Sequence, residues 1–424
     1  MPNHKDQNPG PDQGPDEEYS FLQETIKPKP ISREKLLKEF VRIAIYGVIL
    51  GVFACLAFFA LKPWAEHIFR GEPETVTIPE DKEPSDEDQQ TETQPVEEQV
   101  LDSQDYETLM SSMYSLAREA GKGIVSVSRT SGEEDWEAEA TGIRASVTGI
   151  ITADNGQELL ILADCSVCSR ADSWTVTFAD DSVYTATLKK QDRNIGLAVF
   201  SVPRSSISSS TWSAIKVAVL GNSNLVKRGD PVIALGNMFG YAGGYGYGVV
   251  SSGEYKDAFY DGECSVIATD VAAADGGTSV LFNMEGEVIG IAVPSIWEGR
   301  SMATVNAYGI SGLKSVIELL ANGDSVPYIG VSGTSVTTAI QEEQGMPAGI
   351  YVTDVETDSP AMSAGIQIGD VICKVDGEDV TSVVTYQRAL LETEAGSQIT
   401  IGARRLGADG YVDVEFTVTV GSKE

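Results

Sequence analysis

The stretch "DGGTSVLFNMEGEVIG", residues 275–290, combines a tight glycine turn with two adjacent hydroxyls, Thr278 and Ser279. A hydroxyl held at a sharp turn can act as a nucleophile when a neighbouring base removes its proton. The turn can also aim backbone N–H groups at one point, which is how an oxyanion is stabilised. The stretch therefore predicts either an acyl-transfer site or a turn that only preserves the fold, with both hydroxyls solvated or bonded to nearby backbone.

The usual base for such a nucleophile is missing from most of the sequence. Histidine is the common base near neutral pH, and this chain has two histidines, His4 and His67. None occurs from residue 68 to residue 424, which excludes a histidine-based triad within this chain. A lysine base stays open in principle. Lys189 and Lys190 follow a strand-like run, but nothing in the sequence places them beside Thr278.

The cysteines do not point to a metal. Four of the five lie beyond the apolar segment described below, as a C-S-V-C pair, Cys165 and Cys168, and as the isolated Cys264 and Cys373. A structural zinc site needs four ligands, and one CxxC in a chain with two histidines does not supply them. We therefore expect no metal and no cofactor. A disulfide between Cys165 and Cys168 and a pair of small buried thiols both remain open.

Charge limits the partners that the protein can have. The formal net charge is −33, so we expect no binding to nucleic acid and no attraction to anionic lipid surfaces. Twelve of the 63 acidic residues lie between residues 71 and 104, where Lys82 is the only cation. That segment predicts an extended stalk without a core, and an acidic surface that serves solubility alone would explain the rest.

One segment has the composition of a membrane span. Residues 43–61, "IAIYGVILGVFACLAFFAL", carry no charge over 19 residues, which is roughly 28 Å of helix and close to the hydrocarbon thickness. Six Lys or Arg residues precede it between positions 27 and 42, so we expect a cytoplasmic N-terminus and extracytoplasmic domains. A cleaved signal peptide is the alternative, disfavoured by the bulky "KPWAEHIF" that follows. The expected order is a disordered tail at 1–40, a transmembrane helix at 41–62 and an acidic linker at 63–107.

The elements that would position the two hydroxyls are short strands. From residue 124 onward, β-type runs such as "GIVSVSR", "LLILAD" and "GEVIGIAV" alternate with Gly, Asp, Asn and Ser turns, which is typical of an all-β barrel or sandwich. An amphipathic helix, "SGLKSVIELLANG", then ends at Gly323. The last hundred residues form a second unit, with a hairpin at Asp376-Gly377 and a helix in "SVVTYQRALLE".

Taken together, these blocks resemble the HtrA/Deg serine proteases. The resemblance covers residues 120–421 and is carried by four blocks: "SWTVTFADDSVYTATLKKQDRNIGLAVFSV", "GDPVIALGNMFGYAGGYGYGVVSSG", "IATDVAAADGGTSVLFNMEGEVIGIAV" and "YIGV…GIYVTDVETDSPAMSAGIQIGDVICKVDGEDV". It implies an all-β-dominated fold in which a trypsin-like double β-barrel, residues 108–323, is followed by an α+β PDZ domain, residues 325–421.

The resemblance also locates the positions of the catalytic triad. Ser166 stands where the family has histidine, Gly196 where it has aspartate, and Thr278 where it has the nucleophilic serine. The stretch after Thr278 is one residue shorter than in the family, so a shift of register would place Ser279 there instead. The chain thus lacks the His and Asp of the triad.

In the PDZ unit, residues Tyr328, Ile329, Gly330 and Val331 resemble the family's loop for a peptide's terminal carboxylate. The helix in "SVVTYQRALLE" would form the other wall of the groove, with Val384 or Tyr386 lining a side-chain pocket. A PDZ fold that only packs on the barrel is the alternative.

The resulting prediction is a single-pass membrane protein of the cell envelope, with a catalytically inactive protease domain that binds peptide C-termini or unfolded segments. Family members form trimers, so the resemblance implies a homotrimer. An active serine endopeptidase of envelope quality control, and a structural oligomeric scaffold, are the two alternatives.

Overall fold

The computed structural model describes residues 38, 41–42, 44–50, 52, 73–81, 102–130, 146–169, 171, 173–294 and 303–424. The chain divides into two compact units, residues 1–72 and 73–424. The expected tail at 1–40 and the expected span at 41–62 lie mostly outside the described residues, although 44–50 are helical. Within the described part of the chain, no helix is both long enough and apolar enough to cross a membrane.

The first barrel follows a helix, α2 (Ser103–Ala120), which begins at a capping box on Asp102. The first residues of this helix lie within 63–107, the segment that the sequence predicts to be an acidic linker. The barrel closes in the strand order β1-β2-β3-β6-β5-β4, all neighbours being antiparallel. Its strands are β1 (Ile124–Thr130), β2 (Ser146–Asp154), β3 (Glu158–Asp164), β4 (Ser173–Thr177), β5 (Val183–Asp192) and β6 (Leu197–Pro203). Between β3 and β4 lies a short 3-10 turn, η3 (Cys165–Cys168).

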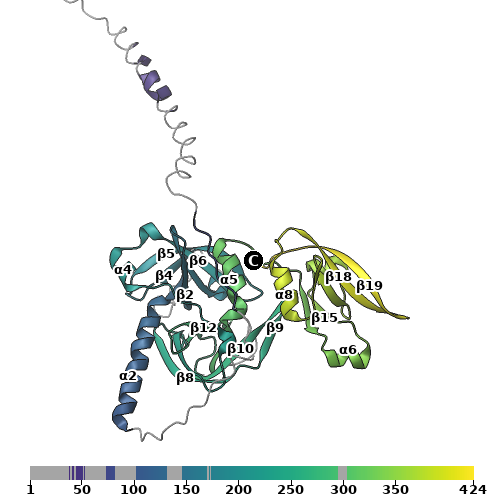
Figure 1. Ribbon diagram of the computed structural model, residues 1–424. Coiled ribbons are helices and arrows are strands. Elements are labelled where there is room, and N and C mark those ends of the chain that lie inside the picture. Colours follow the sequence, from purple (N-terminus) through teal and green to yellow (C-terminus); the bar gives the residue numbers. More distant parts are fainter. Residues whose placement is uncertain are drawn as a thin grey trace, which may run out of the picture. The chain divides into compact units, whose positions relative to one another are not determined.

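The second barrel has the order β13-β12-β11-β7-β8-β10-β9, and a further β10–β13 pairing closes it. Its strands are β7 (Pro231–Asn237), β8 (Gly244–Ser252), β9 (Lys256–Phe259), β10 (Gly262–Ala272), β11 (Thr278–Phe282), β12 (Val288–Ala292) and β13 (Thr304–Gly309). The predicted double barrel is thus confirmed (Figure 1).

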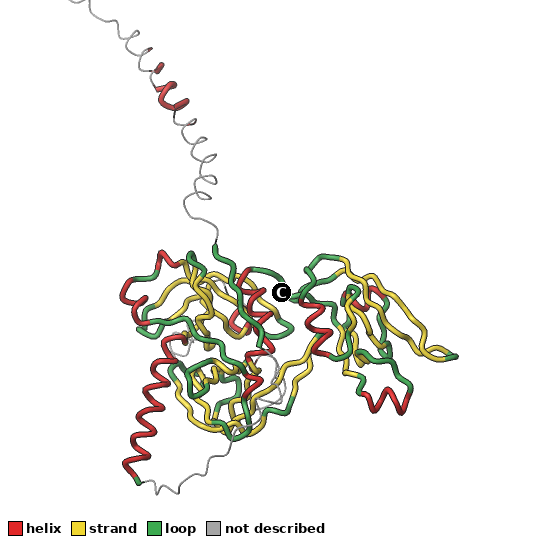
Figure 2. The backbone as a smooth tube through the Cα atoms, in the orientation of Figure 1, coloured by secondary structure: helices red, strands yellow, loops and turns green. Residues whose placement is uncertain are grey.

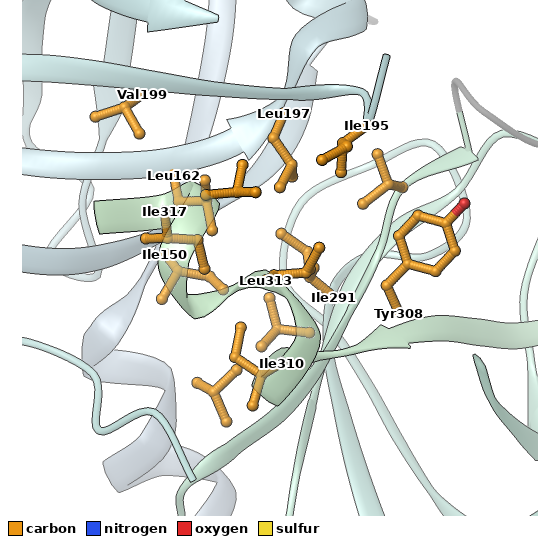
Figure 3. Close-up of a cluster of buried hydrophobic side chains, with 14 of the residues drawn as sticks. Ile150, Leu162, Ile195, Leu197, Val199, Ile291, Tyr308, Ile310, Leu313 and Ile317 are labelled. Atoms are coloured by element: carbon orange, nitrogen blue, oxygen red, sulfur yellow. The ribbon is translucent and has the colours of Figure 1, made fainter. Parts of the chain in front are cut away.

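A shared hydrophobic core joins the two barrels. It contains Ile150 and Leu162 from the first barrel and Ile291 from the second. The helix α5 (Lys314–Asn322) adds Ile317 to the same cluster, as Figure 3 shows. The helix ends where Gly323 adopts φ 86°, the left-handed conformation that glycine adopts without strain. Each barrel also has its own interior cluster.

The PDZ domain is a sheet in the order β14-β15-β16-β18-β19, with β17 paired to β16. Its strands are β14 (Val331–Ser335), β15 (Ile350–Val355), β16 (Val371–Val375), β17 (Glu378–Asp379), β18 (Gln398–Gly407) and β19 (Gly410–Thr419); its helices are α6 (Thr338–Gln344), α7 (Pro360–Ala364) and α8 (Val383–Leu391). Figure 2 shows the strands and α8 of this unit. The predicted hairpin at Asp376-Gly377 is confirmed, since Val375 pairs with Glu378 across it.

The segment 73–81 differs from the expected extended stalk. Its backbone groups at Val76 and Ile78 bond to the side chains of Asn322 and Glu318, at 2.9 and 2.6 Å. Both apolar side chains also pack against the shared core. The sequence suggested otherwise because acidic residues dominate the segment, whereas two β-branched residues within it are sufficient to dock it on α5.

Candidate functional site

Thr278 lies at the start of β11, where the second barrel meets β2 of the first. Its side chain is 4% exposed. Its Oγ1 accepts a hydrogen bond from the Thr148 backbone N–H at 2.7 Å and lies 3.0 Å from Thr148 Oγ1. Thr148 Oγ1 also bonds to the Thr278 carbonyl at 2.9 Å. The hydroxyl therefore joins two barrels, which matches the backbone-bonded alternative for this stretch but not the solvated one.

Ser279 is the next residue of β11 and is even less accessible. It lies opposite Gly236 of β7 and Ala292 of β12, so its backbone is inside a sheet. The residue is 1% exposed, and within the described structure its Oγ has no hydrogen-bond partner. Among the described residues, no side chain that could act as a base lies within hydrogen-bond distance of this hydroxyl.

Two backbone N–H groups of the glycine loop before β11 are already hydrogen-bonded within the protein. Ala274 N–H bonds to the Met238 carbonyl at 2.8 Å, and Gly277 N–H bonds to the Ala274 carbonyl at 3.0 Å. In an oxyanion hole of the trypsin type, the nucleophile and the residue two before it supply the N–H groups. If Ser279 were the nucleophile, Gly277 would be that second donor, and its N–H is already used within the turn.

Ser166 and Gly196, which the resemblance assigns to the positions of histidine and aspartate, lie on segments that are joined by a backbone hydrogen bond. The Cys165 N–H bonds to the Gly196 carbonyl at 2.9 Å. Ser166 is exposed in η3, where its N–H bonds to the Asp164 carboxylate at 2.7 Å. Gly196 is buried with φ 79° and has no side chain to offer. Neither of these two positions carries an imidazole or a carboxylate.

Two of the described cysteines, Cys165 and Cys168, lie in η3. In the described structure, Cys165, Cys168, Cys264 and Cys373 form no disulfide. Burial raises the pKa of Cys168 to about 12, so its nucleophilic thiolate is scarce at neutral pH. In the part of the chain that the structure describes, no group of three His, Cys, Asp or Glu residues could hold a metal ion.

The second candidate site is the PDZ loop at Tyr328–Val331. Three of its four backbone N–H groups, those of Ile329, Gly330 and Val331, donate to the side chain of Asp261, at 2.7, 2.7 and 3.0 Å. The Tyr386 hydroxyl of α8 donates to the same carboxylate at 2.7 Å. Asp261 comes from the turn between β9 and β10 of the second barrel and is 5% exposed. Burial raises the pKa of Asp261, and the four hydrogen bonds oppose that rise.

Sequence reasoning identified the loop but missed Asp261. It also expected Val384 or Tyr386 to line a pocket for a ligand side chain. Tyr386 is buried and its hydroxyl faces Asp261, whereas Val384 is 37% exposed. The only local signal for Asp261 is an Asp-Gly turn between two strand-like runs, which predicts a hairpin and carries no information on what the tip contacts.

Comparison with known proteins now adds to this geometry. The model of the trypsin-like peptidase domain matches residues 147–291, and that of the PDZ domain matches residues 327–419. The "Serine protease Do-like HtrB" of Bacillus subtilis is 27% identical over 290 residues, which is 64% of this chain and 62% of that protein. A "Probable periplasmic serine endoprotease DegP-like" of Pseudomonas savastanoi pv. phaseolicola is 30% identical over 305 residues, 69% of this chain and 58% of that protein. The chain therefore spans less than two thirds of these relatives.

Solved structures share the fold. "HtrA-type protease AlgW with tripeptide" superposes with a TM-score of 0.52 at 23% identity, covering 73% of this chain and 97% of that chain. "HtrA-type protease AlgW with decapeptide" gives 0.50 at 21% identity, covering 73% and 98%.

Proposed function

Because the chain belongs to the HtrA/Deg family, which joins a trypsin-like peptidase domain to a PDZ domain, we propose that it is a catalytically inactive member that binds peptide C-termini. One observation carries the proposal: no histidine occurs between residue 68 and residue 424. A serine or threonine hydroxyl is a weak nucleophile until a base takes its proton. The protease domain then serves as a scaffold, and the PDZ domain is the functional part.

The surroundings of the two candidate hydroxyls support this proposal. Thr278 Oγ1 accepts a hydrogen bond from the Thr148 N–H. Ser279 Oγ is buried and has no hydrogen-bond partner among the described residues. The positions at Ser166 and Gly196 offer a hydroxyl and no side chain, respectively. Neither can act as the imidazole base or as the carboxylate that orients it.

The PDZ loop supplies the binding chemistry. Peptides that bind such domains add a strand to the sheet edge and place their terminal carboxylate on backbone N–H groups. In this chain the Ile329, Gly330 and Val331 N–H groups converge on one carboxylate, and β14 is an edge strand of its sheet. The two solved relatives with a bound tripeptide or decapeptide are consistent with a peptide as the ligand.

The proposed location is the cell envelope, with residues 41–62 as the anchor and the domains at 108–323 and 325–421 on the outer side. The uncharged run at residues 43–61 and the preceding basic residues support it, and the DegP-like relative is named periplasmic.

The absence of catalysis is tested with a fluorophosphonate probe, which labels activated hydroxyls. We expect no labelling of the full-length chain and no cleavage of unfolded casein above the level of the double variant Thr278→Ala/Ser279→Ala. Labelling that Thr278→Ala or Ser279→Ala removes would overturn the proposal and establish an active endopeptidase with an unfamiliar base.

Carboxylate capture is tested by fluorescence polarisation with a pool of labelled decapeptides. Each is synthesised with a free C-terminus and with a C-terminal amide. We expect the free form to bind at least tenfold more tightly, because the amide removes the charge that the three N–H groups hold. Equal binding of the free and the amidated peptides would contradict carboxylate capture by the PDZ loop.

A further inference from the structure

The turn between β9 and β10 reaches out of the protease domain and ends in the PDZ loop. Phe259 pairs with Gly262, so Tyr260 and Asp261 form the tip of this hairpin. Asp261 has φ 64°, a left-handed conformation that costs free energy in a residue with a side chain and is therefore maintained by its contacts. Those contacts are the loop and the α8 residue Tyr386.

The Asp261 carboxylate makes the contacts that a peptide's terminal carboxylate would make. Both of its oxygens are used: Oδ2 accepts from Ile329 and Gly330, while Oδ1 accepts from Val331 and the Tyr386 hydroxyl. Three successive backbone N–H groups aimed at one anion form a nest. Once Asp261 is seated, the nest has no free donor for a second carboxylate.

The backbone of the hairpin tip also makes a contact that a bound peptide would make. The Asp261 N–H donates to the Val331 carbonyl at 2.7 Å. Val331 is the first residue of the edge strand β14, so this bond is of the kind that an added strand makes. Around it, the Tyr260 hydroxyl donates to Asp354 at 3.0 Å, and the Lys423 ammonium lies 5.1 Å from the centre of the Tyr260 ring.

The conformation of the loop that holds Asp261 requires glycine at position 330. Gly330 has φ 87°, and a Cβ at that position would lie 2.5 Å from the Ser359 Cβ. A side chain there would force the loop away from Ser359 and misalign its N–H groups. The geometry of the nest therefore depends on Gly330. In this structure the Asp261 side chain of the same chain fills the nest.

We propose that Asp261 is an internal ligand of the PDZ loop, and that a C-terminal peptide binds only by displacing the β9–β10 hairpin tip. The inference rests on the proposed function of the loop and adds its regulation. Displacement would free the end of β10, a strand that continues to Ala272 beside the glycine loop before Thr278.

Competition of this kind lowers the apparent affinity by the fraction of molecules whose loop is open. If about one molecule in ten or fewer is open, removing Asp261 tightens peptide binding by roughly tenfold or more. The same decapeptide pool therefore provides the test, using the full-length chain, Asp261→Ala and the isosteric Asp261→Asn. Asp379→Ala is the matched control, because it removes one charge from an exposed PDZ position, 78% accessible, in a surface pair with Lys374.

We expect both Asp261 variants to bind free-carboxylate peptides at least tenfold more tightly than the unmodified chain, with Asp379→Ala unchanged. In the unmodified chain, saturating peptide should speed hydrogen exchange at residues 260–262. Equal affinity in all four proteins, with the free form still preferred over the amide, would overturn the internal ligand and leave the proposed function intact. No preference for the free form even in Asp261→Ala and Asp261→Asn would overturn carboxylate capture, and the internal ligand with it.

Discussion

Thr278 and Ser279 are neighbours in β11, yet their hydroxyls have opposite hydrogen-bonding states. Thr278 Oγ1 accepts from the Thr148 N–H, whereas Ser279 Oγ is buried without a partner. Removing one partner of a buried hydrogen bond leaves the other unsatisfied, at a cost of about 1–3 kcal/mol. Removing a hydroxyl that has no partner carries no such penalty.

We therefore expect Thr278→Val to lower the free energy of unfolding by about 1–3 kcal/mol, while Ser279→Ala changes it by less than about 0.5 kcal/mol or raises it. Urea unfolding at pH 7.5 measures both. A larger loss for Ser279→Ala than for Thr278→Val would contradict this and would make the Ser279 hydroxyl the one that stabilises β11.

Asp192 is the buried acid at the end of β5. Its Oδ1 accepts from the Asn194 N–H at 2.9 Å, and within the described structure its Oδ2 has no partner. Burial raises the pKa of Asp192 to about 6. Between the ordinary value near 4 and 6, the folded chain binds more protons at this site than the unfolded chain does. Its contribution to the free energy of unfolding therefore falls as pH rises through that window, by up to about 3 kcal/mol.

Asp192→Asn should remove this dependence, because the amide keeps the Asn194 contact and stays neutral. We expect the variant to be more stable than the unmodified chain by about 1–3 kcal/mol at pH 7.5, and equal to it near pH 4. Urea unfolding between pH 4 and 7.5 gives the comparison, with the exposed Asp413→Asn as control. A constant difference across that range would contradict a raised pKa.

The segment 73–81 shows how one docked stretch depends on a single buried charge. Lys314 of α5 is 6% exposed at its side chain and pairs with Asp81 at 2.8 Å. Breaking such a pair leaves an uncompensated buried charge, which costs about 3–5 kcal/mol. The neighbouring Glu80 instead accepts a hydrogen bond from Ser315 at the surface.

Asp81→Ala should accordingly lower the free energy of unfolding by about 3 kcal/mol, and Glu80→Ala by less than about 1 kcal/mol. Thermal unfolding of the full-length variants measures this. The double variant Asp81→Ala/Lys314→Met should recover most of the loss, because the charge is gone from both sides. A double variant no more stable than Asp81→Ala would show that the packing of 73–81, and not the buried charge, is responsible.

At this scale the sequence predicted elements better than contacts. Gly323 and Gly365 end α5 and α7 in the left-handed conformation, and Asp376-Gly377 makes its hairpin, because local chemistry alone decides these features. The docking of 73–81 could not be predicted, since its side-chain partners between Ser311 and Asn322 lie 230 to 246 positions away. The absence of histidine after residue 67 is visible in the sequence itself. The contact between Thr148 and Thr278 joins residues 130 positions apart, so the sequence could not predict it.

For the whole molecule, the important junction is the one between the protease domain, which comprises both barrels, and the PDZ domain. Exposed pairs contribute little there: Lys190 contacts Glu424 at 2.7 Å, with side chains 22% and 41% accessible. Asp261 differs, because it makes four charge-assisted hydrogen bonds in a buried site. A ligand that binds only the folded state stabilises it, and an internal ligand does so at a high effective concentration.

The PDZ domain should therefore lose stability when Asp261 is removed, even though the residue belongs to the other domain. In differential scanning calorimetry we expect one transition for the unmodified full-length chain. Asp261→Ala should split off a PDZ transition that is lower by about 5–10 °C, as expected for a loss of 1–2 kcal/mol in a domain of this size. Lys190→Ala, which breaks only the exposed pair, should shift the transition by less than about 2 °C.

Added free-carboxylate peptide should raise the melting temperature of the separate PDZ transition in Asp261→Ala, because the peptide carboxylate binds the nest in place of Asp261. A PDZ transition that stays merged in Asp261→Ala would mean that packing against α8, and not the carboxylate, couples the two domains.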